Sequence, residues 1–567
     1  MKLKKLFYLV FIMVLIYTLF FVPKAYGATK ITYDGTNLDE TKYPGYKALL
    51  DNLKNTYGYN IELYYTGIDW GEALTLQYQG HGTNSSFNLF YPDNTKKGRW
   101  YCPICGEQNY DTGIPCASIE AIAYMLDPRN SLADESVYQF MNFEGNNLNK
   151  AQIASIVEGT YLNDQEVIDA LFDAASGSNP DECSNLNAAF LVAKIIIEQG
   201  SNGSILSKGE GYQGDYVGVY NFFNYGATVT SECSDVIRNG LNYARAAGWT
   251  SKIAAIIGGS KLIKESFVDL RGQNTFYFLK YNYAGKSSWA AMQYEQNIMG
   301  AESKGSLLRK YYKKQPNAAS PTMVIPLYEN MPVEKAARPT TNSRSSLTYE
   351  EGVIEYAPSG LKVRAGQGIK AVHINTISNG SKVKIIKRAD IASSDGYYWD
   401  LICASDGTYG YAPRIVGGDV CIKGTGVYKT IYGRDDTSGD GKEVIATSDG
   451  YIHMTPTVMI EDIKKVYPTA IVRAVDGNEM YSGDVGTYSK VEIDGKTYTV
   501  VKRGDLDGDG HATILDVIRI FNHAKEVKLI TDPIEYQTAR ILNGDKVTIL
   551  DVTKLLNYVK GLDSISL

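Results

Sequence analysis

A glutamate at the end of an apolar segment is the strongest candidate for acid–base chemistry. Residues 188–198 read AAFLVAKIIIE, a run that is apolar almost all the way round and predicts a buried helix. Glu198 falls in its last turn, just before Gly200, a residue type that commonly ends helices. An apolar wall and the negative end of the helix dipole both disfavour a carboxylate. We therefore expect a raised pKa for Glu198, as a general acid near neutral pH requires; a glutamate at a frayed, hydrated helix end is the alternative.

A second carboxylate would complete a glycosidase-type pair. Glu210 and Asp215 lie in the Gly-rich segment 201–218, and either can be the base, or a solvated loop charge. An inverting enzyme holds its two carboxyl groups about 6.5–9.5 Å apart to admit a water, and a retaining enzyme about 5–5.5 Å. The sequence does not separate these two routes.

Several short motifs follow Glu198 in order. They are EQGSNGS at 198–204, GVYNFFNYGA at 218–227, AAIIGGS at 254–260 and GQNTFY at 272–277. This order resembles the bacterial glucosaminidases of glycoside hydrolase family 73, including the glucosaminidase modules of autolysins, over roughly residues 185–312. The stretch around 127–130 (DPRN) also resembles the region that precedes this module in clostridial relatives.

The resemblance implies a lysozyme-like α+β catalytic domain with Glu198 as general acid. The implied reaction is cleavage of the β-1,4 bond after N-acetylglucosamine in peptidoglycan, in which the substrate's own N-acetyl group can replace a second protein carboxylate. Residues 292–294 read MQY where the family often has HQY, which removes a polar sugar contact at most. The implied sugar-binding residues are Tyr220, Asn221, Gln273, Asn274 and Tyr277.

Two other functions fit the same residues. A lytic transglycosylase shares the implied fold and a single glutamate, but cleaves after N-acetylmuramic acid. A non-catalytic adhesin would only bind wall glycans.

Amidases and metal endopeptidases need clustered histidines, and cysteine-type endopeptidases need a Cys–His pair. Only His81 precedes residue 373, so those classes are excluded.

Near the C-terminus, the sequence DLDGDGHATILD has the spacing of a calcium loop. Counting Asp505 as position 1, acidic ligands fall at positions 3, 5 and 12, and Gly510 takes the tight turn at position 6. The sequence therefore predicts one structural Ca²⁺ site. Its ligands are Asp505, Asp507, Asp509, His511 through its carbonyl, Thr513 directly or through water, and Asp516.

The same segment contains an internal repeat. TILDV at 513–517 recurs at 548–552. Together, the loop and the repeat resemble a type I dockerin over roughly 501–563, which implies an all-α tail and a cohesin domain on another exported protein as partner. Aligning the second loop on Asp551 places Arg540 or Ile541 at position 1, so we expect that calcium site to be weak or absent.

Cys102, Cys105 and Cys116 form a single cysteine cluster among seven cysteines. The spacing can hold zinc, but a structural zinc site uses four ligands and the neighbourhood supplies three. In an exported protein a disulfide within this loop is the simpler interpretation. The sequence leaves both open and favours the disulfide.

The remaining segments define the expected domain organisation. Lysines precede an apolar run at 6–22, and small residues follow at 25 and 27, so residues 1–27 are predicted to be a signal peptide and the protein to be secreted and wall-associated. Net charge is −6, which offers no basic field for nucleic acid.

The motifs LKVRAG, YYWD and GYAP between 361 and 413 resemble a bacterial SH3 domain, implying a small β-barrel that docks on wall peptides or serves as a spacer. The expected order is an N-terminal region at 28–170, the catalytic domain at 171–312, a linker at 313–350, the SH3-like domain at 351–418, a β-rich module at 421–500 and the dockerin-like domain at 501–563.

Overall fold

The computed structural model divides the chain into two compact units. The first comprises Met1–Phe90, Ile119–Arg338 and Thr348–Thr430, and the second Tyr91–Ser118, Pro339–Leu347 and Ile431–Leu567. In the part of the chain that is described, no helix has the length and apolarity needed to cross a membrane. The predicted signal peptide at 1–27 lies outside the described residues. These are 29–559 and 565, apart from 82–85, 91–97, 107, 111–113, 146–147, 177–182, 232, 286–288, 291–292, 316–318, 342, 435–444, 449, 482 and 543.

A three-stranded sheet lies at the centre of the first unit. Its strands are β1 (Thr29–Thr32), β2 (Asn60–Asp69) and β7 (Thr322–Glu329), in the order β1-β2-β7. β2 and β7 run parallel, with Ile61 opposite Met323. The apolar run MVIPLY buries β7. The linker predicted at 313–350 is therefore wrong: the Pro, Thr, Ser and Asn around this run concealed a core strand.

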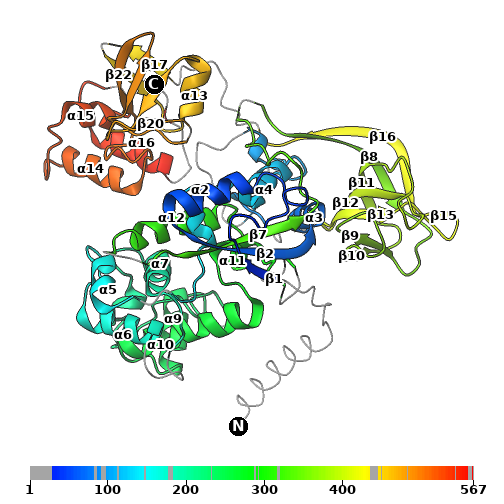
Figure 1. The fold of residues 1–567 in the computed structure, drawn as a ribbon, viewed down its shortest axis with the longest axis horizontal. Helices are drawn as coiled ribbons and strands as arrows, with labels where there is room; N and C mark the ends of the chain where they lie inside the picture. Colours follow the sequence, from blue (N-terminus) through cyan, green and yellow to red (C-terminus); the bar gives the residue numbers. More distant parts are fainter. Residues whose placement is uncertain are drawn as a thin grey trace. The chain divides into compact units, whose positions relative to one another are not determined.

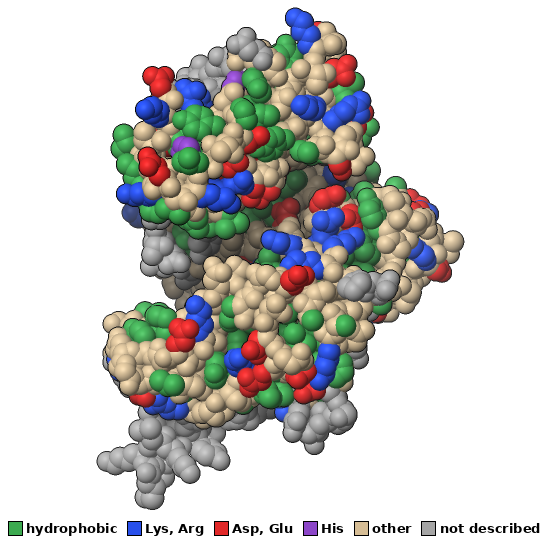
Figure 2. Space-filling view, turned by 90° about the vertical axis from the view of Figure 1, so that its left-hand side faces the viewer, with side chains coloured by type: hydrophobic (Ala, Val, Ile, Leu, Met, Phe, Trp, Pro, Cys, Tyr) green, Lys and Arg blue, Asp and Glu red, His purple; other side chains and the backbone are tan. Residues whose placement is uncertain are grey.

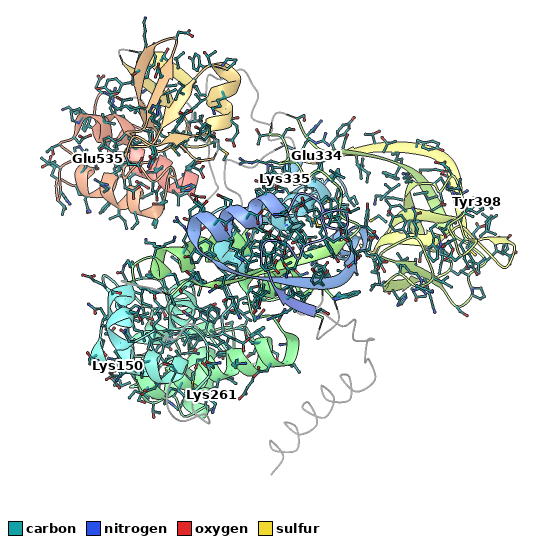
Figure 3. The ribbon with its side chains drawn as sticks, in the orientation of Figure 1. Lys150, Lys261, Glu334, Lys335, Tyr398 and Glu535 are labelled. Carbon is teal, nitrogen blue, oxygen red and sulfur yellow. The ribbon has the colours of Figure 1, made fainter. Side chains whose placement is uncertain are left out.

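Helices surround this sheet and extend beyond it (Figure 1). In Figure 3, Lys150 and Lys261 mark two of them, α5 and α10. Helix α4 ends at Leu126, because Asp127 and Pro128 begin a 3₁₀ turn. The helices are α2 (Lys47–Tyr57), α3 (Trp70–Gln77), α4 (Ile119–Leu126), α5 (Lys150–Val157), α6 (Gln165–Ser176), α7 (Ala188–Gln199), α8 (Ile205–Lys208), α9 (Val236–Ala246), α10 (Lys252–Ile263), α11 (Phe276–Tyr281) and α12 (Gly300–Tyr312), with a π-helical turn at Lys264–Asp269 and 3₁₀ turns at Pro128–Ser131 and Val137–Phe140.

One hydrophobic core joins the sheet and these helices. Tyr33, Leu63, Phe143, Phe190 and Tyr328 all belong to it. The predicted boundary between an N-terminal region and a catalytic domain at residues 170/171 therefore does not separate two cores. The described residues of 29–90 and 119–170 fold together with the segment that carries Glu198, because each buries apolar side chains against the other.

A β-module completes the first unit. Its strands pair in the order β10-β9-β13-β12-β11-β8-β16 around a core that includes Ile354, Val363 and Ile402. The β structure predicted at 351–418 is present, but the sheet also includes residues before and after those limits. The strands are β8 (Ser346–Ile354), β9 (Leu361–Arg364), β10 (His373–Ile377), β11 (Lys382–Lys387), β12 (Trp399–Ala404), β13 (Tyr409–Pro413) and β16 (Ile422–Tyr432), with a small β14 (Ile415–Val416) and β15 (Asp419–Val420) pair.

The second unit combines a sheet with a helical tail. The sheet order is β17-β18-β22-β21-β19-β20, and α14 packs against α16 over a separate core that includes Leu506, Ile520 and Leu555. The predicted β-rich module and helical tail are both present. The elements are β17 (Ile445–Ser448), β18 (Tyr451–Met454), α13 (Ile460–Val466), β19 (Ile471–Arg473), β20 (Glu479–Met480), β21 (Lys490–Ile493), β22 (Lys496–Lys502), α14 (Ile514–Ala524), α15 (Pro533–Ala539) and α16 (Ile549–Val559), plus a 3₁₀ turn at Gly98–Trp100 and the pair β3 (Asn109–Tyr110) and β4 (Ile114–Pro115).

Charged side chains of both signs are mixed on the face that Figure 2 shows. Lysines and arginines alternate there with aspartates, glutamates and hydrophobic groups. This view agrees with the small negative net charge of the whole chain, −6.

Candidate active site and calcium loop

Helix α7 carries Glu198 to the surface of the core. Asn187 caps its start by accepting hydrogen bonds from the backbone N–H groups of Ala189 and Phe190, and Gly200 ends it with a φ of 74°. Ten of its twelve residues are buried, as the apolar sequence predicts. The side chain of Glu198 is 16% exposed, so its carboxylate lies at the boundary between core and solvent.

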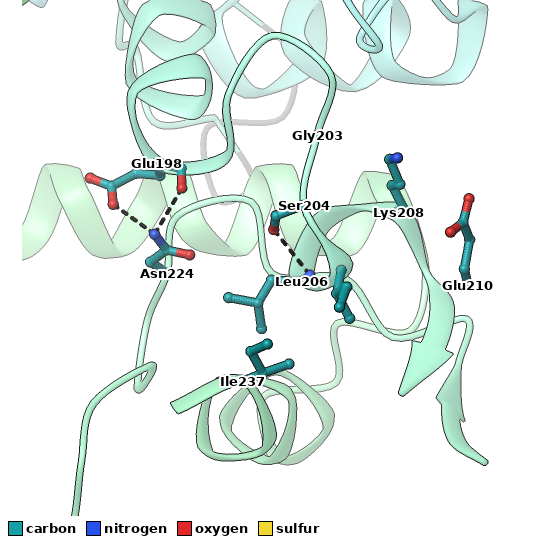
Figure 4. Close-up of a pocket in the computed structure, with 9 residues that line it drawn as sticks. Glu198, Gly203, Ser204, Leu206, Lys208, Glu210, Asn224 and Ile237 are labelled. Carbon is teal, nitrogen blue, oxygen red and sulfur yellow. Dashed lines mark hydrogen bonds between the residues drawn. The ribbon is translucent and has the colours of Figure 1, made fainter. Parts of the chain in front are cut away.

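Three side chains hold the carboxylate of Glu198. Lys194, one helical turn earlier, forms an ion pair with Oε1. The hydroxyl of Tyr294 donates to the same oxygen at 2.9 Å. The Asn224 amide donates to Oε2 at 2.9 Å and to the Glu198 backbone carbonyl at 3.0 Å (Figure 4). Together these contacts fix the orientation of the carboxylate.

The charge of Lys194 changes the expected protonation of Glu198. Burial alone would raise the pKa of Glu198, but the Lys194 ammonium and the hydrogen bonds from Lys194, Tyr294 and Asn224 outweigh it, and the pKa lies below its ordinary value. Burial also lowers the pKa of Lys194, although Glu198 opposes that shift. The predicted raised pKa of Glu198 is therefore wrong for this unliganded structure, because the prediction considered the apolar wall without the buried lysine.

A pocket of about 490 Å³ opens beside Glu198. Its size falls within the range of small-ligand sites, roughly 300–1,000 Å³. Figure 4 shows Glu198 and Asn224 on one side, and Lys208 and Glu210 on the other. The lining residues are Glu198, Gly203, Ser204, Ile205, Leu206, Lys208, Glu210, Asn224 and Ile237.

The two candidates for a second carboxylate have different surroundings. Both lie in one hairpin, formed by β5 (Glu210–Tyr212) and β6 (Asp215–Val217). Glu210 lines the pocket, whereas Asp215 does not. Asp215 is 61% exposed and forms an ion pair with Arg245 at 2.7 Å, and the hydrogen bond from Arg245 lowers its pKa. The structure thus brings Glu210, and not Asp215, to the same pocket as Glu198.

The loop that follows the hairpin positions Asn224. Gln199, next to Glu198 on α7, donates through its side-chain amide to the backbone carbonyls of Asn221 and Phe222 and to Oδ1 of Asn224. Asn224 has a φ of 56°, in the left-handed region that asparagine tolerates better than most residues. The loop conformation therefore directs the Asn224 amide at Glu198.

Four of the predicted sugar-binding side chains are buried. Asn221, Gln273, Asn274 and Tyr277 are at most 4% exposed. The Asn221 amide donates to the Tyr225 and Gly240 carbonyls, and the Tyr277 hydroxyl bonds the Leu126 carbonyl. These four side chains therefore lie inside the fold in this structure, and their assignment as sugar contacts stays a prediction. Tyr220 is half-buried and stacked on Phe222, so its assignment stays a prediction.

Sequence reasoning missed three residues of the site: Lys194, Asn224 and Tyr294. Lys194 left a signal, because a lysine four residues before a glutamate in an otherwise apolar helix predicts an ion pair on one face. Asn224 and Tyr294 lay within the motifs already singled out. Their contact with Glu198 depends on tertiary folding, since 96 residues separate Tyr294 from Glu198.

The predicted calcium loop gathers its first three carboxylates. One oxygen each from Asp505, Asp507 and Asp509 lies within 4.8 Å of the others. Gly510 takes a φ of 93°, as expected for the turn position. Asp516 instead accepts hydrogen bonds from the backbone of Leu506 and Thr513, both at 2.8 Å. The three convergent oxygens fit a hard cation, and the assignments of His511 and Thr513 as ligands stay predictions.

The second loop repeats this design without its first ligand. Asp551 accepts hydrogen bonds from the backbone of Leu542 at 2.9 Å and Thr548 at 2.8 Å, as Asp516 does from Leu506 and Thr513. Leu542 lies one residue closer to its aspartate than Leu506 does. The equivalent of Asp505 is therefore Ile541, which is buried in the core. A buried isoleucine offers no side-chain ligand, so the second site remains a weak or absent one by prediction.

Comparisons with known proteins show a partial likeness to bacterial autolysins. No family model matches the chain. It is 26% identical over 202 residues to a bifunctional autolysin of Staphylococcus aureus, and 29% identical over 206 residues to that of Staphylococcus epidermidis. Each match covers 35% of this chain but only 15% and 14% of those longer relatives. Among solved structures, S. aureus glucosaminidase B is 20% identical, with a TM-score of 0.36, over 47% of this chain and 93% of that one. The chain is thus similar in sequence to a limited part of bacterial autolysins.

Proposed function

We propose that this protein is a secreted, wall-associated peptidoglycan hydrolase that cleaves the β-1,4 bond after N-acetylglucosamine. The observation that carries the proposal is Glu198, fixed by Asn224 and Tyr294 in the wall of a pocket that Glu210 also lines. The sequence likeness to bacterial autolysins supports the choice of peptidoglycan as substrate.

In the proposed mechanism Glu198 is the general acid that protonates the leaving glycosidic oxygen. In the unliganded protein its pKa is held low by Lys194, which opposes the effect of burial. A sugar that fills the pocket excludes water from Glu198, and such desolvation favours the protonated carboxyl group. Substrate binding thereby prepares the acid for proton transfer.

Glu210 is the proposed partner of Glu198. Both residues line the same pocket, Glu198 on one side and Glu210 on the other (Figure 4). A carboxylate in that place can activate a water on the face opposite the leaving group. Tyr220 remains the proposed aromatic contact for the sugar.

We propose that the β-module and the helical tail hold the enzyme at the cell wall and on a partner protein. The β-module at 346–432 is assigned to wall binding as an SH3-like domain, and the tail at 501–563 to calcium-dependent docking on a cohesin-bearing protein. Asp505, Asp507 and Asp509, with His511, Thr513 and Asp516, would hold the Ca²⁺, whose part is to order the loop.

The enzyme proposal is tested with Glu198→Gln, which keeps the size of the side chain but removes its proton. Lysis of purified cell walls is expected to fall by about 10²–10⁴-fold, the usual contribution of a general acid. Asp215→Asn is the matched control, because Asp215 lies outside the pocket lining. Unchanged lysis by Glu198→Gln would show that Glu198 is not the general acid, and absence of lysis by the wild-type protein would favour the non-catalytic adhesin.

A further inference from the structure

A fully buried lysine contacts the residues on either side of Tyr294. Lys280, on α11, is 0% exposed. Its ammonium donates to the Gln293 side-chain oxygen at 3.1 Å and to the Glu295 backbone carbonyl at 3.3 Å. A third hydrogen bond goes to the Phe87 carbonyl at 3.2 Å. An ammonium has three donors, so these three neutral oxygens use all of them.

The segment 293–295 is held by further bonds on both sides of Tyr294. The Gln293 side-chain amide donates to Oε1 of Gln77 at 3.0 Å. The backbone amide of Tyr294 donates to the carbonyl of Leu279, the residue before Lys280, at 2.9 Å. Residues 279 and 280 of α11 thus contact three successive residues of this segment, with Tyr294 in the middle.

Tyr294 is the part of this segment that reaches the carboxylate of Glu198. Its hydroxyl donates to Oε1 at 2.9 Å. Its ring has the ammonium of Lys194 at 4.3 Å and that of Lys304 at 5.0 Å from its centroid. We propose that Lys280 is a positioning residue, which holds segment 293–295 so that the Tyr294 hydroxyl stays on Glu198. The inference rests on the proposed role of Glu198 as the acid.

Packing alone accounts less well for a lysine at this place. Burial lowers the pKa of Lys280 to about 7, although the charge of Glu295 opposes that shift. An unbranched apolar side chain would fill the same space without the cost of burying an ammonium. Such a side chain has no donors, so it could not join the Phe87 carbonyl to Gln293 and Glu295. What the lysine adds is the position of the segment.

The first test is Lys280→Met, which keeps an unbranched side chain and removes the three donors. We expect kcat for lysis of purified walls to fall by about 10²-fold, the effect of moving a catalytic group by roughly 1 Å. KM should stay unchanged, because Lys280 does not line the pocket. Lys264→Met is the control: this lysine pairs with Glu144 in the same unit and should leave kcat unchanged. A raised KM with full kcat would overturn the proposal.

The pH profile separates positioning from general loosening of the fold. The hydrogen bond from Tyr294 lowers the pKa of Glu198, so its loss raises that pKa. Lys280→Met and Tyr294→Phe should therefore both move the alkaline limb of kcat/KM to higher pH. Adding Lys280→Met to Tyr294→Phe should change neither kcat nor the limb further, because no hydroxyl is left to position. Losses that multiply in the double variant would overturn the proposal.

A readout without activity distinguishes this inference from the proposed function. The free energies of unfolding of wild type, both single variants and the double variant are expected to be non-additive, since Lys280→Met already weakens the bond that Tyr294→Phe removes. Additive values would overturn the inference even in an active enzyme, whereas absence of lysis by folded wild-type protein would overturn the proposed function alone. If Lys280→Met does not fold, Gln293→Leu takes its place in both cycles, with the same expected and contrary results.

Discussion

At the scale of single residues, the Lys194–Glu198 pair determines when the acid carries its proton. The ammonium of Lys194 lies 4% exposed beneath the carboxylate, and both side chains stand on the same face of α7. Burial raises the pKa of Glu198, but Lys194 more than offsets that effect. In the proposed mechanism Glu198 must be protonated before bond cleavage, so we expect Lys194 to set the alkaline limit of activity.

Replacing the lysine is expected to move that limit. In Lys194→Met the carboxylate stays buried and loses its cation, so the pKa of Glu198 rises. The alkaline limb of the pH profile of kcat/KM, which reports the free enzyme, therefore moves to higher pH. Thermal unfolding of the variant controls for its fold. A limb that stays in place or moves to lower pH would contradict the role given to Lys194.

Tyr277 tests whether the buried motif residues act on the sugar or on the fold. Tyr277→Phe removes the hydroxyl that bonds the Leu126 carbonyl and Tyr328. We expect the free energy of unfolding to fall by about 1–3 kcal/mol, the cost of leaving a buried polar group unsatisfied, with KM unchanged. Chemical denaturation and steady-state kinetics measure the two quantities. A raised KM with full stability would instead show a direct sugar contact.

At the scale of elements, one hairpin separates the two candidate bases. β5 begins with Glu210 at the pocket, whereas β6 begins with Asp215, which pairs with Arg245. Glu210→Gln is expected to lower kcat by about 10²–10⁴-fold, and Asp215→Asn to leave it nearly unchanged, because only Glu210 lines the pocket proposed to bind the sugar. Rates of wall lysis at saturating substrate measure both. Loss of activity in Asp215→Asn alone would reverse the assignment.

The elements also show how far sequence reasoning reaches. The apolar period of 188–198 predicted α7 and placed Glu198 correctly at its end. The same reasoning missed β7, since its eight residues are flanked by loop-like composition and only pairing with β2 makes them a strand. Likewise, Asn221 and Tyr277 stood in the right motifs but their hydrogen bonds lie inside the core. Local pattern predicts elements, whereas partners far along the chain decide which side chains reach the site.

At the scale of the whole molecule, calcium is expected to act on one unit. The loop of Asp505, Asp507 and Asp509 belongs to the second unit, and the Glu198 pocket to the first. Calorimetry is expected to show that chelation lowers the unfolding temperature of the second unit alone, because a ligand stabilises only the fold that binds it. Asp507→Ala should remove the response to calcium. An equal shift of both transitions, or none, would contradict the calcium assignment.

The metal-free second unit should also respond to pH. Burial raises the pKa of Asp505 from 3.8 to about 6, although the Thr487 amide and Lys502 lower it in part. The folded state therefore holds a proton that the unfolded state releases, so stability is full at low pH and falls as pH rises through about 6. Unfolding followed from pH 4 to 7 in chelator should show this loss, and added Ca²⁺ should abolish it. If the stability in chelator instead rises from pH 4 to 7, the raised pKa of Asp505 in the folded state is contradicted.

The central claim is that Glu198 cleaves peptidoglycan after N-acetylglucosamine, and the most direct measurement is mass analysis of the glycan products. Purified walls are digested with the wild-type protein and with Glu198→Gln, and the new chain ends are identified. We expect new reducing-end N-acetylglucosamine with the wild-type protein and no new ends with the variant. Products ending in 1,6-anhydro-N-acetylmuramic acid would identify a lytic transglycosylase and contradict the proposed cleavage.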